Sequence, residues 1–106
     1  MALETVGGDS ELLREAVGIF LELDYPRHLK ELKEGLARQD APTVKAAAHG
    51  IKGACASFGG LPARDVALQI ETLARQGNLQ DAPGAAEKLE TEMSRFAAYY
   101  ARPTWD

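Results

Sequence analysis

A histidine on one face of a predicted helix stands among lysines and very small side chains. Lys45, His49, Lys52, Gly53 and Ala56 follow one another at helical spacing, so they share one outward surface of that helix. A neutral imidazole is a competent nucleophile toward phosphorus, and a lysine one turn away attracts the oxygens of a bound phosphoryl group. The pattern therefore predicts a phosphoryl-accepting histidine. Without these neighbours, His49 would be typical of an inert surface residue.

Two glycines lie in the same helix, where glycine is unfavourable. Gly50 and Gly53 each cost up to about 1 kcal/mol relative to alanine in a helix interior. Such a cost is expected where the backbone must stay bare so that another molecule can approach closely. The alternative is that the glycines allow tight packing between helices. That alternative applies more to Gly50 than to Gly53, which lies on the histidine's own face.

An acidic residue is predicted to lie opposite the histidine on the next helix. The turn between the two helices centres near Gly60, and His49 and Glu71 are each 11 residues away from it. Residues at equal distances from the turn of an antiparallel helical hairpin lie at similar heights. A carboxylate at that height holds the Nδ1–H of the ring and leaves Nε2 free to attack. The alternative is a solvated glutamate on an exposed helix face.

The elements that position these residues are expected to be helices throughout. The sequence has 18 alanines against seven valines and isoleucines, a ratio that favours helix over strand. Apolar residues recur every three to four positions, which predicts helices over about 9–23, 25–38, 41–58, 62–76 and 82–101. Short connections make sequential helices antiparallel neighbours. The predicted fold class is all-α: an antiparallel up-down-up-down four-helix bundle, with an additional N-terminal helix that caps one end.

Proline, aspartate and glycine mark the predicted boundaries. The stripe of the first helix includes Leu12 and Leu23, and a restart is expected at Asp24 and Pro26, because proline is tolerated in the first turn of a helix but not in its interior. Later helices are expected to begin and end at similar signals, namely Asp40-Ala41-Pro42, Gly59-Gly60, Pro62, Gly77, Asp81-Ala82-Pro83 and Pro103.

Length and charge exclude several classes of protein. A chain of 106 residues fits one domain, which we expect to span residues 1–106, and a net charge of −4 gives no electrostatic footprint for nucleic acid. No apolar run is long enough to cross a membrane, and one cysteine cannot form an internal disulfide, so the composition predicts a cytoplasmic protein. Without a glycine-rich phosphate loop or a cluster of metal-binding carboxylates, we expect no autonomous catalysis.

Other candidate residues carry weaker signals. His28, beside basic residues on a predicted surface, is interpreted as an ordinary polar residue. Cys55 is interpreted as a small core residue, and two histidines with one buried cysteine do not make a zinc site. Tyr99, Tyr100 and Trp105 are expected to pack against the end of the bundle.

The segment around the histidine resembles a known family. His49-Gly50-Ile51-Lys52-Gly53, continuing through Ser57-Phe58-Gly59, resembles the H-x-x-K-G core of histidine-containing phosphotransfer (HPt) domains, the relay modules of two-component signalling. The resemblance extends over residues 7–15 upstream and 68–71 downstream, so it covers nearly the whole chain. The sequence departs from the commonest pattern at Gly50, where a larger residue is usual.

The resemblance implies specific roles for four residues. His49 accepts a phosphoryl group from an aspartate of a receiver domain and passes it to another receiver's aspartate. Lys52 matches the lysine that favours the phosphorylated state, and Gly53 matches the small residue that gives the receiver access. Related phosphotransfer domains of chemotaxis kinases carry a glutamate at the place of Glu71. The domain itself needs no cofactor, because magnesium is held by the receiver.

The implied partners are response-regulator receiver domains. A hybrid sensor kinase is a further implied partner, either as a separate protein or as the larger protein that contains this domain. Nucleic acid and direct membrane contact are not expected, and we expect a monomer. Two alternatives stay open. One is the phosphoacceptor domain of a chemotaxis-type histidine kinase, and the other is a helical adaptor in which His49 is inert.

Overall fold

Helices account for nearly all of the described chain, as the alanine-rich composition predicts. The structure, a computed structural model, describes residues 10–101, so the expectations for Pro103 and Trp105 lie outside the described residues. Its elements are α2 (Ser10–Ile19), the π-helical segment η1 (Phe20–Asp24), α3 (Tyr25–Ala37), α4 (Ala41–Phe58), α5 (Leu61–Arg75) and α6 (Ala82–Tyr100). No strand occurs within residues 10–101, which confirms the all-α fold class.

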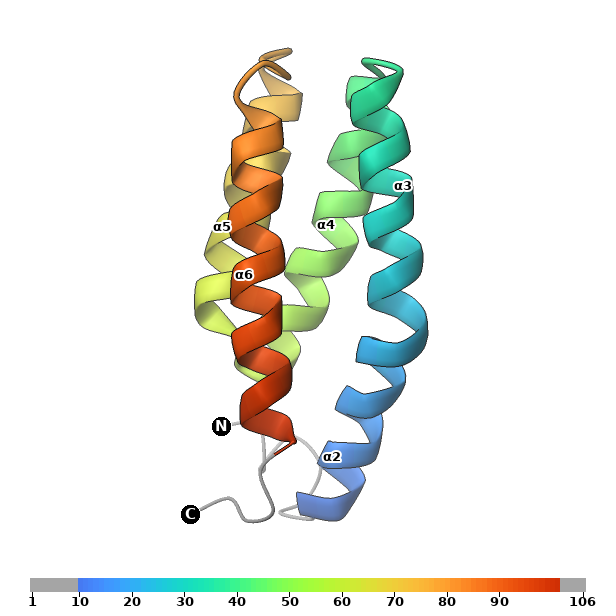
Figure 1. The fold of residues 1–106 in the computed structure, drawn as a ribbon, viewed down its shortest axis with the longest axis vertical. Helices are drawn as coiled ribbons and strands as arrows, with labels where there is room; N and C mark the ends of the chain where they lie inside the picture. The colour runs from blue at the N-terminus through green and yellow to red at the C-terminus, as the bar shows by residue number, and fades with distance from the viewer. Residues whose placement is uncertain (1–9, 102–106) are drawn as a thin grey trace.

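The last four helices run alternately up and down one axis and form an antiparallel bundle (Figure 1). Helix α4 packs against both α3 and α5, and α6 packs against α5. An ion pair of 3.4 Å between Lys33 and Glu90 links α3 to α6. Among the described helices, none combines the length and the apolar character needed to cross a membrane.

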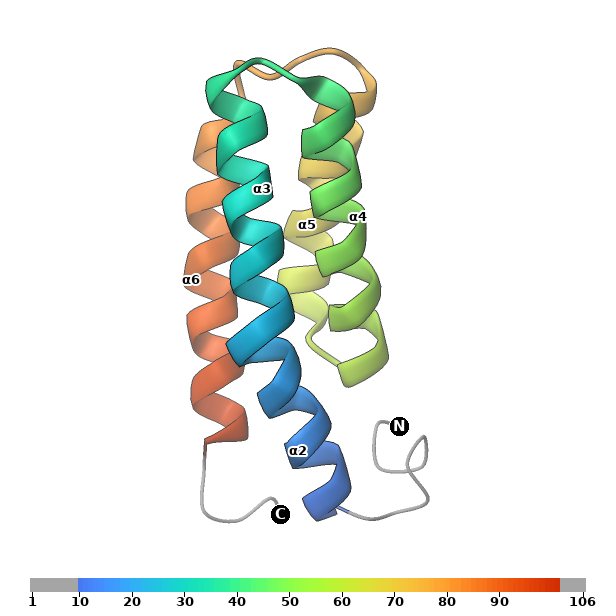
Figure 2. The same cartoon turned by 90° about the vertical axis from the view of Figure 1, so that its right-hand side faces the viewer.

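The first two predicted helices are continuous, and the expected restart at Asp24 is wrong. The backbone stays helical from α2 through η1 into α3, and Figure 2 shows α2 continuing the line of α3 instead of capping the bundle. Pro26 has no N–H for the carbonyl of Glu22, and its ring would press on that carbonyl in a regular α-helix. The wider π turn, in which the Tyr25 N–H donates to the Phe20 oxygen, accommodates the proline without ending the helix.

The π turn also changes which side chains face the core. Val17 and Phe20 are buried as the stripe predicts, whereas Leu23 is exposed. A turn of more than 3.6 residues rotates the following positions around the helix axis, so the three-to-four spacing no longer holds beyond Phe20. Leu12, at the other end of the predicted stripe, is also largely exposed.

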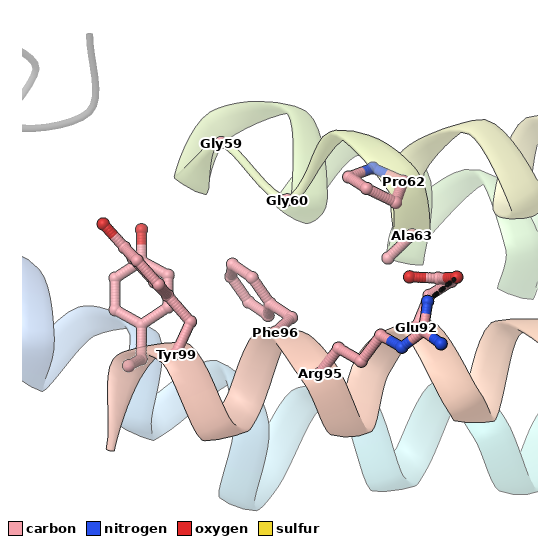
Figure 3. A pocket seen from close by; sticks show the side chains of 9 residues that line it. Gly59, Gly60, Pro62, Ala63, Glu92, Arg95, Phe96 and Tyr99 are labelled. Carbon is pink, nitrogen blue, oxygen red and sulfur yellow. Dashed lines mark hydrogen bonds and ion pairs between the residues drawn. The ribbon is translucent and has the colours of Figure 1, made fainter. Parts of the chain in front are cut away.

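A tight turn sets the height of α4 against α5. Gly59 ends α4 in the left-handed conformation with φ of +78°, and the Gly60 N–H donates to the Cys55 oxygen over 2.8 Å. Gly60 is buried under Phe96, whose ring would lie 3.0 Å from any added Cβ. Figure 3 shows Phe96 of α6 directed toward this turn. The turn and its cover leave little freedom in the register of the two helices.

Small side chains bring α4 and α5 close together. Their facing surfaces are rich in buried alanine, and the buried residues of the two helices are Val44, Ala47, Ala48, Ile51, Cys55, Ala63, Ala67, Ile70, Glu71 and Ala74. Every one of them is apolar except Glu71. At the end of the bundle where α4 turns into α5, Tyr100, buried as expected, donates its hydroxyl to the Phe58 oxygen over 2.6 Å, whereas Tyr99 is about half exposed.

Candidate functional site

The histidine and its predicted carboxylate partner meet between α4 and α5. The side chain of His49 is 66% exposed, and its Nδ1 lies 3.0 Å from Oε2 of Glu71. Glu71 itself is only 5% exposed, so it is not the solvated glutamate of the alternative interpretation. An accessible imidazole therefore stands on a buried carboxylate.

Glu71 and three basic side chains around its carboxylate form a cluster of charged and polar groups. Besides the His49 ring, the Lys52 ammonium lies 2.6 Å from Oε1 and the Arg75 guanidinium lies 3.5 Å from Oε2. Lys52 was predicted on the outward surface; its side chain is 26% exposed and is directed to Glu71. Arg75 was missed, although its position four residues after Glu71 on one helix is a spacing at which opposite charges meet.

The cluster keeps the buried carboxyl ionised. The Lys52 ammonium, and after it the His49 contact, hold the pKa of Glu71 below its ordinary value of 4.5, against the opposing effect of burial. An ionised carboxylate can only accept hydrogen bonds, so Nδ1 of His49 carries the proton and donates it to Oε2. The lone pair of the neutral ring then resides on Nε2, which is the nitrogen available to an incoming electrophile.

The Lys52 ammonium compensates the negative charge on Oε1 of Glu71. That oxygen is buried and has no hydrogen bond of ordinary geometry, so the ion pair with Lys52 is its compensation. A buried charge that loses its partner is strongly destabilising. The position of Lys52 three residues after His49 thus has a structural consequence in addition to its place near the ring.

The two glycines near the histidine differ in their surroundings. An added Cβ at Gly53 would meet nothing within 4 Å, so this part of the α4 surface is open. An added Cβ at Gly50 would lie 2.8 Å from Cε1 of His28. Gly50 therefore allows α3 and α4 to pack closely, which is the alternative role predicted for the glycines from the sequence. Gly53 has no such role.

His28 is not the ordinary surface residue that its neighbours in the sequence suggest. Its ring is partly buried against Gly50, and its Nδ1 has no hydrogen bond, lying 3.6 Å from a carboxylate oxygen of Glu31. Whether a histidine on α3 is solvated depends on the size of the α4 residue that faces it. A glycine there makes room for the ring, a relation that sequence periodicity does not show.

No group of three metal-ligating side chains occurs within residues 10–101. Cys55 is buried in the core, where its Sγ lies 3.6 Å from Sδ of Met93, and burial raises the pKa of its thiol to about 11. Such a thiol is a packing group and not a nucleophile at neutral pH.

The cluster leads to a test of stability. Lys52→Ala leaves the buried carboxylate short of a partner; complete burial would make this worth about 3–5 kcal/mol, and with His49 and Arg75 still present we expect a loss of about 2 kcal/mol at neutral pH. Because the pKa of Glu71 is lowered by folding, its stabilising effect is complete above the ordinary value of 4.5 and is lost as pH falls through the lower folded-state value. The Lys52→Ala loss should therefore shrink in acid.

Urea unfolding between neutral pH and about pH 3 measures both effects. Lys88→Ala is the matched control, because Lys88 is exposed on α6 and its removal changes the net charge equally. The control should change the free energy of unfolding by less than about 0.5 kcal/mol at every pH. Equal losses for the two variants, or a Lys52→Ala loss that does not depend on pH, would contradict the ion-pair interpretation.

Comparison with known families agrees with the geometry. The model of the Hpt domain family matches residues 15–99, which is most of the chain and includes α3 to α5 entirely. The chain therefore belongs to the Hpt domain family. No curated protein and no solved structure gave a match.

Membership of the Hpt domain family indicates a general function. Hpt domains are carriers in histidine-containing phosphotransfer within two-component phosphorelays, and they interact with receiver domains of those systems. The helical bundle seen here is consistent with that class.

Proposed function

We propose that this chain is a phosphorelay carrier in which Nε2 of His49 receives a phosphoryl group from a receiver-domain aspartate and passes it to the aspartate of another receiver. The observation that supports this most directly is the exposed His49 ring, whose Nδ1–H is held by the buried, ionised Glu71. That arrangement selects one ring nitrogen and presents it to solvent, as a transfer nucleophile requires.

The transfer step balances on the groups that are present. The Nε2 lone pair attacks phosphorus, the N–P bond forms, and the P–O bond to the donor aspartate breaks with its electron pair, which restores that carboxylate. The ring keeps its Nδ1 proton, so positive charge develops on it while Nδ1–H faces Oε2 of Glu71. In the second transfer an acceptor carboxylate attacks phosphorus, and neutral imidazole leaves with the N–P electron pair. Glu71 is a positioning residue in both steps.

Two neighbours complete the proposed site. Lys52 favours the phosphorylated state, mainly by keeping Glu71 ionised and to a lesser extent by its own charge, since its ammonium is bound to that carboxylate. Gly53, four residues after His49, leaves the α4 surface open where receiver loops must approach the ring. Both proposals rest on the position of these residues beside a ring that is accessible.

The remaining chemistry is assigned to the partner. Phosphoryl transfer needs charge neutralisation that a divalent cation usually supplies, and we assign magnesium to the receiver. The domain then needs no cofactor of its own and has no autonomous kinase activity. We propose one domain over residues 1–106 that acts as a monomer in the cytoplasm, an assignment supported by the acidic sequence with its single cysteine.

A second candidate function is favoured by one contact. The carboxylate beside His49 matches the glutamate that phosphotransfer domains of chemotaxis kinases carry, which favours phosphorylation by an ATP-bound kinase domain in place of a receiver. The two candidates share the site and differ only in the donor. A helical adaptor with inert His49 is the third reading, and the open surface at Gly53 argues against it.

Incubation with phosphorylated receivers separates these functions. A panel of receivers charged with acetyl phosphate and magnesium should transfer label to the domain, and the product should be labile in acid and stable in base, as a phosphoramidate is. Labelling that occurs only with an ATP-loaded chemotaxis-type kinase domain would favour the second candidate. Absence of label from both donors would favour the adaptor.

A further inference from the structure

An open hollow beside His49 is lined by two basic side chains, those of Lys45 and Arg75. Its lining consists of Pro42, Lys45, Ala46, His49, Glu71 and Arg75, and it measures about 620 Å³. A phosphoryl group on the ring occupies a small part of such a volume. The polar side chains around the ring in this hollow are therefore candidates for contacting the phosphoryl oxygens.

The register of α4 and α5 brings two of these side chains to one height. Lys45 precedes His49 by four residues on α4, and Arg75 follows Glu71 by four residues on α5. Because the helices are antiparallel, both are displaced about 6 Å from the histidine toward the same end of the bundle, the end at the top of Figure 1. Lys52 lies in the opposite direction along α4.

The basic side chains on the two sides of His49 along the bundle axis differ in how strongly a carboxylate already binds them. The Lys52 ammonium is bound to Oε1 of Glu71 at 2.6 Å. Lys45 is exposed, and no carboxylate of residues 10–101 lies within ion-pair distance of it. Arg75 is 53% exposed and reaches Oε2 of Glu71 only at 3.5 Å, on an oxygen that already accepts from His49. The positive charge that remains for a new anion is that of Lys45 and Arg75.

We propose that Lys45 and Arg75 bind the oxygens of the phosphoryl group on His49, while Lys52 acts mainly by keeping Glu71 charged. This inference rests on the proposed function. A guanidinium presents paired N–H donors that match two phosphoryl oxygens, and an ammonium acts as a point charge beside them. Together they stabilise the dianion relative to the monoanion of the phosphorylated ring.

Phosphorus NMR of the phosphorylated domain tests this without an identified receiver. Potassium phosphoramidate serves as the donor, and the pH dependence of the phosphohistidine resonance gives the second pKa of the phosphoryl group. Exposed charge pairs are weak, so Lys45→Gln and Arg75→Gln should each raise that pKa by about 0.5 unit, and the double variant by about 1 unit. Arg75→Lys should restore most of the Arg75 effect, because it keeps the charge.

Lys88→Gln on α6 is the matched control and should leave the phosphoryl pKa unchanged. Circular dichroism and urea unfolding on each variant show that the fold is retained. If Lys45→Gln and Arg75→Gln titrate like Lys88→Gln while His49 carries the phosphoryl group, this inference is wrong and the proposed function stands. If the wild-type domain and His49→Gln are labelled alike, both the proposed function and this inference fail.

Discussion

His49→Gln is expected to abolish phosphorylation of the domain while leaving its helical content unchanged. The side chain is 66% exposed and fills no part of the core, so a glutamine of similar length fits the same surface. Glutamine has no ring nitrogen with a free lone pair, and removal of a nucleophile eliminates the covalent route, a loss of about 100-fold or more in transfer rate. Transfer from a charged receiver, together with circular dichroism, measures both properties.

His28→Gln is the matched control for this prediction, because His28 is the only other histidine of the chain. Its ring is partly buried between α3 and α4 and has no carboxylate at hydrogen-bond distance from Nδ1. Label should therefore persist in His28→Gln and disappear in His49→Gln. Label that survives in His49→Gln, or is lost only in His28→Gln, would refute the assignment of the phosphoryl acceptor.

Gly53→Gln is expected to separate transfer from stability. The added side chain would project from α4 one turn after His49, on open surface where we propose that the receiver docks. A displacement of the reacting groups by about 1 Å is enough to slow transfer by about 100-fold. Helix propensity should at the same time raise the free energy of unfolding by a few tenths of a kcal/mol up to about 1. Transfer kinetics and urea unfolding test the two effects on one protein.

Gly50 provides the contrast that shows whether the surroundings of each glycine matter. Gly53→Ala should stabilise the fold by up to about 1 kcal/mol, because its Cβ enters open space. Gly50→Ala should lose that gain, because its Cβ displaces the His28 ring; in a His28→Ala background the gain should return. A Gly53→Gln domain that is destabilised and transfers at the normal rate would mean that Gly53, too, serves packing.

Local signals in the sequence were sufficient to predict where most of the helices begin and end. Asp40 ahead of Pro42, and Gly59 with Gly60, mark helix ends through cap and left-handed conformations that depend on the nearest residues alone. Because the turn at Gly60 is short, equal spacing from it placed Glu71 opposite His49, as the structure has it. The boundary at Asp24 failed, since proline near a wide turn is compatible with a continuous helix.

Periodicity assigned the face of each residue but not its partner. The sequence placed Lys52 on the His49 side of α4, yet whether its ammonium meets solvent, a phosphoryl group or a carboxylate depends on the distance between helices. The alanines between α4 and α5 bring the helices near enough for Glu71 to be buried, and a buried carboxylate requires the nearest cations. Arg75 joins it for the same reason.

Residue types and their spacing along single helices were enough to predict the all-α class, the exposed position of the proposed nucleophile His49 and the bare surface beside it. The packing of the helices against one another, and not the sequence of α4, reveals that Gly50 makes room for His28 whereas Gly53 faces open space. Identical residues three positions apart differ in this way because α3 covers the part of α4 that bears Gly50, whereas none of the described helices covers the part that bears Gly53. That difference arises from how helices pack, which spacing within a single helix does not contain.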